Sequence, residues 1–338
     1  MESQQLMASA ILGIVLFGVF GNIISFYLFS RPHMRASSVN ILLCALASVD
    51  LSLLLLSIPV FVIPGLNLWK DEKTQNMYHA YMLKSVYPVN LIMQTCSIYI
   101  MVLITIERWT AVCRPLQVRA WCTPTKSRLA LLVVLFSAIA YNFVRFFEYS
   151  IIRTPEGDII FERNLRDTEL YPNYMIGYFT ASYLITHFLI PFSIMMIMNG
   201  HVCWTIVILR RARLALTQQM DNDTLADNVH YQVGMWKLQT VQSVIGTWQQ
   251  REHNTTFMLM LVTAIFACCN TLPFLLNLVE CAIPDFFTNP QTSYFAYYLN
   301  DISNLLVVLN SATTFLIYYA FSAKYRSSFN DLFRLVTS

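Results

Sequence analysis

Charged side chains are scarce in this sequence. Lys, Arg, Asp and Glu make up only 12% of the 338 residues, whereas hydrophobic residues make up 56% and the mean hydropathy is +0.52. A soluble domain is about one quarter charged and just under half apolar. The apolar excess is spread over the whole chain and is too large for one globular core. A soluble protein is therefore excluded, and an integral membrane protein is predicted.

Motifs of enzymes are also missing. The sequence has no cluster of metal ligands, no nucleophile-base pair and no phosphate-binding loop. Its histidines are poorly placed for chemistry, because His33, His201, His230 and His253 lie far apart in the sequence. An enzyme is therefore not supported, and neither a metal, an organic cofactor nor a nucleic-acid partner is expected.

Seven apolar runs are long enough to cross a bilayer, which takes about 20 residues per helix. They cover roughly 9–29, 39–65, 85–106, 129–147, 175–209, 255–283 and 293–321. The first run is too long and begins too late to be a cleaved signal peptide, and no cationic segment precedes it. The sequence thus predicts an all-α fold, a seven-transmembrane helix bundle over residues 1–321, inserted in the lipid bilayer.

The basic residues give the orientation. Fifteen of the 22 Lys and Arg fall on the side of the C-terminus, so the positive-inside rule predicts an outer N-terminus and a cytoplasmic C-terminus. Twelve of the 19 acidic residues fall on the other side. Either this acidic mouth attracts cations, or the outer loops simply lack the basic bias; both explanations stay open.

A short amphipathic segment follows the seventh run, at residues 322–338. Phe321, Tyr325, Phe329 and Phe333 recur at four-residue steps. This spacing predicts a cytoplasmic helix that lies on the membrane surface. The segment contains no Cys, so a palmitoyl anchor is not available.

Asp50 is the clearest charge inside a span, and such charges are costly and usually functional. Polar groups that could meet it occur in other spans: Asn22, Ser97, Asn310, Ser311 and Thr314. A carboxylate ringed by hydroxyl and amide groups could hold a small cation such as sodium. The same partners would also serve a protonated Asp50 that only packs helices.

Several residues occur in the order and at the depth seen in rhodopsin-like G-protein-coupled receptors. They are Asn22, Asp50, Glu107, Arg108, Trp109, Pro191, Pro273 and Tyr318. Within that class, five segments look most like invertebrate FMRFamide-like neuropeptide receptors: "QTCSIYIMVLITIERWTAVCRPL", "FSAIAYNFVRFFE", "TELYPNYMIGY", "CNTLPFLLNLVE" and "NLLVVLNSATTFLIYYAFSAKYRSSF". The resemblance extends over nearly the whole chain.

The resemblance implies roles in activation and G-protein coupling for Glu107, Arg108, Trp109, Pro273 and Tyr318. In such receptors Glu107 would hold Arg108 at rest, and an outward swing of the sixth helix would let Arg108 contact a heterotrimeric G protein. An arginine fork beside a carboxylate is a strong but breakable pair. Arrestin is a further partner that the resemblance suggests.

The sequence departs from the family pattern at four places. The seventh helix has Thr314-Phe315 where the family has Asn-Pro. The sixth has Thr271 in place of the Trp two residues before Pro273. The fourth span lacks the expected Trp. No Cys is present in the loop between the fourth and fifth spans, so the usual disulfide to the third helix cannot form. A mobile outer loop is therefore expected.

The ligand can be narrowed by exclusion. Residues 302–318 contain no Lys, which excludes a Schiff base with retinal. Amine receptors pair the ligand's ammonium group with an Asp of the third helix; this chain has Asn90 at that position, which argues against a biogenic amine. A peptide with an amidated C-terminus fits a pocket of amide and aromatic side chains. In a peptide that ends in Arg-Phe-amide, the Arg would pair with Glu280 or Asp301. The expected ligand-binding residues are Asn90, Gln94, Tyr183, His187, Phe274, Asn277, Glu280, Tyr297, Asp301 and Asn304, although each could merely pack helices.

Two other functions compete with a peptide receptor. A chemosensory or orphan seven-helix receptor with weak or atypical G-protein signalling is favoured by the altered motifs. A transporter or channel predicts internal repeats and several charges along a path, whereas Asp50 is the only clear mid-span charge. The sequence is therefore interpreted as a plasma-membrane, multi-pass receptor for an amidated peptide.

Overall fold

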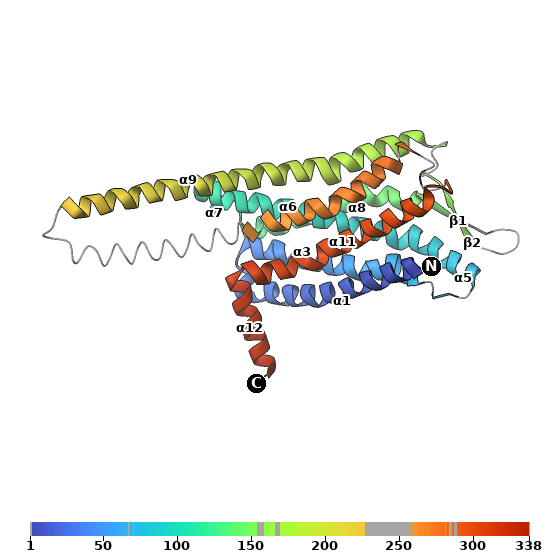
Figure 1. Cartoon of the computed structure of the whole chain (residues 1–338), viewed down its shortest axis with the longest axis horizontal. Helices are drawn as coiled ribbons and strands as arrows, with labels where there is room; N and C mark the ends of the chain where they lie inside the picture. Colours follow the sequence, from blue (N-terminus) through green and yellow to red (C-terminus); the bar gives the residue numbers. More distant parts are fainter. Residues whose placement is uncertain are drawn as a thin grey trace.

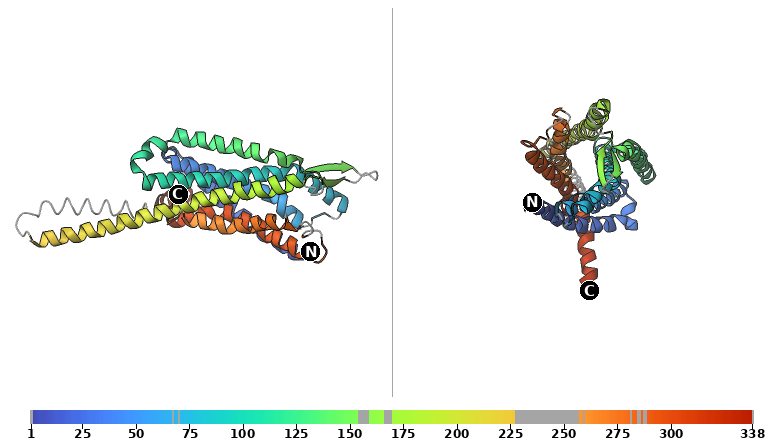
Figure 2. Two further views of the ribbon diagram at one scale, coloured as in Figure 1. Left: turned by 90° about the horizontal axis from the view of Figure 1, so that it is seen from above. Right: turned by 90° about the vertical axis from the view of Figure 1, so that its right-hand side faces the viewer.

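The computed structural model describes residues 2–66, 68–69, 71–153, 159–165, 170–226, 257–258, 260–280, 282–283, 286 and 289–337. Within these residues seven helices are long and apolar enough to cross a membrane. They pack lengthwise into one elongated bundle (Figure 1), and the view along its axis shows the helices grouped around a common centre (Figure 2). The predicted seven-helix fold is confirmed.

The first four spans alternate with short helical segments. The long helices are α1 (Glu2–Ser30), α3 (Ser38–Ser57), α6 (Tyr87–Cys113) and α8 (Pro124–Asn142). The short ones are α2 (Pro32–Arg35), α4 (Ile63–Leu66), α5 (Glu72–Tyr81) and α7 (Pro115–Trp121). A π-helical turn at Ile58–Val62 joins α3 to α4, and a 3₁₀ turn at Phe143–Phe147 extends α8.

The last three spans complete the bundle. The fifth begins with π-helical turns at Tyr174–Ser182 and Leu184–Leu189 and continues as α9 (Ile190–Ala226). The sixth is the helix Met260–Glu280, and the seventh is α11 (Ser293–Phe321). The predicted runs 175–209 and 293–321 match these helices closely. Parts of the predicted run 255–283 lie outside the described residues.

The third span is much longer than the predicted run 85–106. It extends over Lys73–Cys113, because a π-helical turn at Met82–Val86 joins α5 to α6 without a break. The Asp71 carboxylate caps the start of α5 by accepting hydrogen bonds from the backbone of Lys73 and Thr74. The Thr74 hydroxyl also donates to it, which lowers the pKa of Asp71 below its ordinary value. The polar composition of α5 conceals this helix from a search for apolar runs.

A two-stranded hairpin adds a feature that the sequence reading did not predict. Strands β1 (Tyr149–Arg153) and β2 (Ile159–Arg163) pair antiparallel, with Tyr149 opposite Arg163 and Arg153 opposite Ile159. A signal was present, because β-branched residues flank the turn-forming Pro155 and Gly157 in the sequence. The hairpin lies between the fourth and fifth spans.

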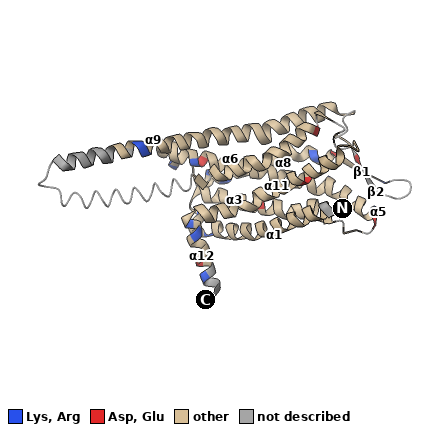
Figure 3. Cartoon of the chain, in the orientation of Figure 1, with Lys and Arg blue, Asp and Glu red and all other residues tan. Residues whose placement is uncertain are grey.

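The two ends of the bundle differ. The N-terminus, α5 and the hairpin lie at one end, here called the hairpin end (Figure 1). The helix α12 (Ala323–Thr337) turns away from the bundle axis at the other end, here called the α12 end. Uncharged residues dominate the spans, whereas Lys and Arg of α9 and α12 gather at the α12 end (Figure 3). The predicted helix after the seventh span is thus present.

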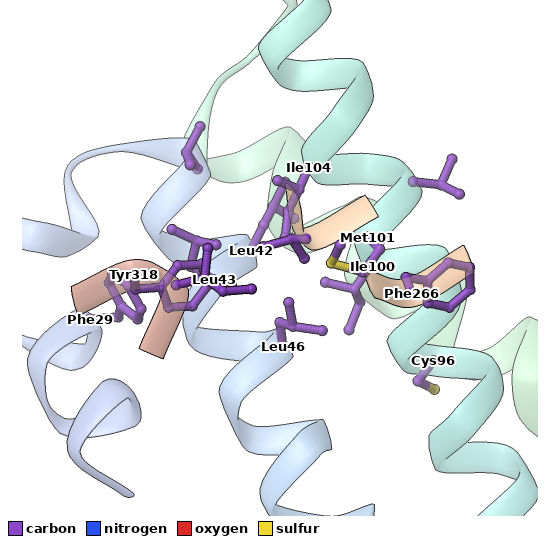
Figure 4. Close-up of a cluster of buried hydrophobic side chains, with 14 of the residues drawn as sticks. Phe29, Leu42, Leu43, Leu46, Cys96, Ile100, Met101, Ile104, Phe266 and Tyr318 are labelled. Carbon is purple, nitrogen blue, oxygen red and sulfur yellow. The ribbon is translucent and has the colours of Figure 1, made fainter. Parts of the chain in front are cut away.

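The main hydrophobic core joins α3, α6, the sixth span and α11. Figure 4 shows side chains from these helices meeting, among them Leu46, Ile100, Met101 and Phe266. By contrast, many apolar side chains on the outer faces of the bundle are exposed, such as Phe20, which is 55% exposed. This distribution suits a bundle in lipid, because lipid-facing side chains need no burial within the protein.

Two glycines let α1 approach its neighbours closely. A Cβ on Gly18 would lie 2.7 Å from the Cβ of Ala312 and 2.8 Å from Leu54. A Cβ on Gly21 would overlap the aromatic ring of Phe315. Small residues at such contacts allow van der Waals packing, which is a main source of helix association in membranes.

Replacing Gly21 by Ala should destabilise the bundle by about 1–3 kcal/mol, the usual cost of overpacking. The reason is that Phe315 must leave its place against α1. The melting temperature of the detergent-solubilised protein measures the effect. Gly13→Ala in the same helix is the matched control, because nothing lies within 4 Å of its added Cβ. Equal melting temperatures for the two variants would contradict this packing.

Candidate functional site

A buried carboxylate links the helices near the middle of the bundle. Asp50 of α3 is 1% exposed and accepts hydrogen bonds from the hydroxyl groups of Ser97 at 3.0 Å and Ser311 at 3.1 Å. The Asn22 amide of α1 donates to the Ser311 carbonyl at 3.0 Å. The Thr314 hydroxyl donates to the Asn310 carbonyl at 3.1 Å within α11. Residues from α1, α3, α6 and α11 therefore form one polar cluster, here called the Asp50 cluster.

The Asp50 cluster has the chemistry of a small cation site. It presents one carboxylate and several hydroxyl and carbonyl oxygens, which are the ligands that hard cations prefer. Among the described residues, no group of three or more His, Cys, Asp and Glu is arranged to hold a metal ion.

A second buried carboxylate lies near the α12 end. Glu107 of α6 is 7% exposed and accepts a hydrogen bond from the Ser38 hydroxyl at the start of α3. Arg108, the next residue, is close enough to attract this carboxylate electrostatically. The indole N–H of Trp109 donates to Nδ1 of His201 in α9 at 2.8 Å. Glu107 therefore connects α6 to α3, and Trp109 connects α6 to α9. Arg108 lies between these two residues in the sequence.

Tyr318 belongs to an aromatic group that joins α1, α11 and α12. Its ring meets Phe29 edge-on, with centroids 5.7 Å apart, and lies 6.1 Å from the ring of Tyr325. The Tyr325 hydroxyl lies 2.8 Å from the Ser25 hydroxyl. Tyr318 is therefore packed in the interior, where it fixes the point at which α11 turns into α12.

Two adjoining cavities open at the hairpin end. The deep cavity has a volume of about 100 Å³, and the shallow cavity one of about 540 Å³. Seven residues line both of them: Phe61, Tyr87, Phe179, Asn277, Glu280, Asn300 and Asn304. The two cavities are therefore neighbouring parts of one site that extends between the helices.

Most of the predicted ligand-binding residues line these cavities. Asn90, Gln94 and Tyr183 line the deep cavity, Tyr297 and Asp301 line the shallow one, and Asn277, Glu280 and Asn304 line both. Pro273, which was assigned to activation, also lines the deep cavity. Eight of the ten predicted ligand-binding residues therefore line these two adjoining cavities.

His187 and Phe274 lie outside the residues that line either cavity. His187 is buried, with Nε2 2.8 Å from the Thr95 hydroxyl and its ring stacked on Tyr183. Phe274 stacks on Phe188 with centroids 4.6 Å apart. His187 therefore supports Tyr183, a residue that lines the deep cavity, whereas Phe274 packs on a residue outside the lining. A direct ligand contact for either of them stays a prediction.

Arg145, which the sequence reading did not assign to the site, also lines the deep cavity. It is 3% exposed and pairs with Glu148, which is 1% exposed, through an Nη1–Oε1 contact of 2.6 Å. The signal was available in the segment "NFVRFFE", because Arg and Glu three residues apart share one helix face. Its burial could not be read from the sequence.

Comparisons with known proteins agree with this architecture. A family model described as "7 transmembrane receptor (rhodopsin family)" matches residues 21–318, which reach from α1 into α11 and include all or part of each span. The chain is 56% identical over 328 residues to the FMRFamide peptide receptor frpr-18 of Caenorhabditis elegans, covering 97% of this chain and 69% of that protein.

Two more distant relatives are also receptors by name. The chain is 32% identical over 324 residues to the FMRFamide receptor of Drosophila melanogaster, covering 94% of this chain and 51% of that protein. It is 24% identical over 334 residues to the Probable G-protein coupled receptor frpr-1 of C. elegans, covering 91% and 74%. The chain thus spans about half the length of the Drosophila relative.

Proposed function

Because this chain belongs to the rhodopsin family of seven-transmembrane receptors, we propose that it is a plasma-membrane receptor for an extracellular amidated neuropeptide of the FMRFamide type. It relays binding to heterotrimeric G proteins, with arrestin as a further partner. The hairpin end faces outside and the α12 end faces the cytoplasm, in agreement with the excess of Lys and Arg on that side.

The chemistry of the two cavities carries the ligand proposal. The shallow cavity contains the carboxyl groups of Glu280 and Asp301, which attract a peptide arginine. The deep cavity is lined by Asn90, Gln94 and further amides, which can both donate to and accept from a terminal carboxamide. The peptide therefore enters with its C-terminus first and leaves its Arg near the acidic groups.

The sixth span couples the cavities to the cytoplasmic end. Pro273 lines the deep cavity and lies within this helix, where a proline commonly bends a membrane helix. A ligand that displaces Pro273 changes this bend. The cytoplasmic half of the helix then swings away from α6 and opens a cleft in which Arg108 contacts the G protein.

Cells that express this chain should give a saturable calcium or cAMP response to a subset of peptides ending in Arg-Phe-amide. Asp301→Asn should lower the potency of such a peptide about tenfold, because an ion pair is lost. A peptide with citrulline in place of Arg should have the same potency on the variant as on the unmodified receptor. Glu162→Gln, at an exposed position of the hairpin, is the control variant. Silence despite surface expression would favour the chemosensory or orphan alternative.

Arg108→Ala should leave surface expression and peptide binding intact and lower the maximal G-protein response more than tenfold, since the proposed contact group is gone. Radioligand binding and nucleotide exchange on the G protein separate the two effects. Arg35→Ala is the matched control, because Arg35 is an exposed arginine at the same end. Full signalling by the Arg108 variant would refute its proposed role.

We further propose that the Asp50 cluster binds sodium in the resting receptor. Replacing choline by sodium at constant ionic strength should then lower agonist affinity about fivefold, a typical coupling between two sites. Asp50→Asn should abolish this dependence. The control is Ser52→Ala, because among the described residues the Ser52 hydroxyl bonds only to the Ser48 carbonyl of its own helix. If sodium has no effect on the unmodified receptor, Asp50 has a packing role alone.

A further inference from the structure

A buried ion pair joins the fourth and fifth spans at the hairpin end. Besides its pairing with Arg145, the Glu148 carboxylate accepts a hydrogen bond from the Tyr174 hydroxyl at 2.6 Å. The Arg145 guanidinium carbon lies 5.0 Å from the ring centres of both Tyr178 and Phe179. The charges of Arg145 and Glu148 therefore cancel within a shell of aromatic rings.

One donor of this arginine is left over. The Nε of Arg145 is buried and has no hydrogen-bond partner in the part of the chain that the structure describes. A buried N–H group without an acceptor is costly, so native proteins rarely keep one without a purpose. Arg145 itself lines the deep cavity, so its guanidinium group can meet an acceptor oxygen on a molecule there and, by turning, offer it this N–H group.

The charge balance of the deep cavity decides which acceptor is favourable. Arg145 is already neutralised by Glu148, and the carboxyl group of Glu280 lines the same cavity. A carboxylate that entered would lose its water without gaining an unpaired cation, which is strongly unfavourable. A neutral carboxamide offers a carbonyl oxygen to Arg145 and its N–H groups to the amide oxygens of Asn90 and Gln94.

We propose that Arg145 binds the carbonyl oxygen of the ligand's terminal carboxamide, and that Glu148 makes the site select the amide over the free acid. This inference rests on the proposed peptide-receptor function. Arg145 contacts the ligand, whereas Glu148 acts through Arg145 as a specificity-determining residue. The buried pair thus reads the charge of the peptide's C-terminus.

The test compares one peptide in three forms: the amide, the free acid and the neutral methyl ester. On the unmodified receptor the acid should be at least about tenfold weaker than the amide, because only the acid carries a charge. The ester keeps the carbonyl oxygen and is neutral but lacks the N–H groups, so its potency should lie between those of the amide and the acid. An acid as potent as the amide would overturn the proposal without any variant.

Glu148→Gln should raise the potency of the acid about tenfold, because the Arg145 charge becomes available and hydrogen bonds between charged groups are the stronger ones. A purely structural role would lower the response to both forms and improve neither. Glu162→Gln is the matched control: it makes the same change at an exposed position of the hairpin. Surface labelling confirms that each variant reaches the membrane.

The double variant Arg145→Gln with Glu148→Gln covers the case in which an unpaired arginine prevents folding. It removes both charges of the pair, should reach the surface, and should weaken the amide about tenfold without strengthening the acid. An unchanged amide potency there, or an unchanged ratio of amide to acid in Glu148→Gln, would overturn the inference alone. A receptor that answers to no amidated peptide would overturn the proposed function as well.

Discussion

A carboxyl group buried between membrane helices must find its partners within the protein, because hydrocarbon supplies none. Three such groups define three levels of this bundle. Glu148 meets Arg145 and Tyr174 near the hairpin end, Asp50 meets Ser97 and Ser311 in the middle, and Glu107 meets Ser38 near the α12 end. The relative positions of the helices depend on these contacts, because dispersion forces alone are not directional.

The middle level explains how the bundle accommodates an unusual seventh helix. This helix has no proline, so α11 continues as one helix from Ser293 to Phe321. Close approach of α1 at Gly18 and Gly21 places the Asn22 amide against the Ser311 carbonyl, and Ser311 in turn donates to Asp50. The hydroxyl of Ser311 therefore connects α11 to Asp50 without the polar residue that the family usually has there.

The sequence predicted what depends on composition and periodicity, and missed what depends on the approach of distant segments. Apolar runs located all seven spans, and Asp50 led to Ser97 and Ser311 because a mid-membrane charge needs polar partners. The helical extension at α5 was missed because it is polar, and Arg145 because its burial arises only when Tyr178 and Phe179 close over it. His187 was predicted to contact the ligand, whereas its ring is held by Thr95 and it is not among the residues that line the two cavities.

The loop between the fourth and fifth spans contains no Cys, so noncovalent contacts must hold it. All the described cysteines are free, and the loop between the fourth and fifth spans was expected to be mobile. In the structure Glu148 fastens the end of the fourth span to Tyr174, and its carbonyl accepts the backbone N–H of Asn164 beyond β2. A covalent bond holds a loop irrespective of what binds nearby, whereas an ion pair beside a cavity changes its energy with the charge of the ligand. The pair that fastens this loop is therefore also the one that we propose for recognition of the ligand.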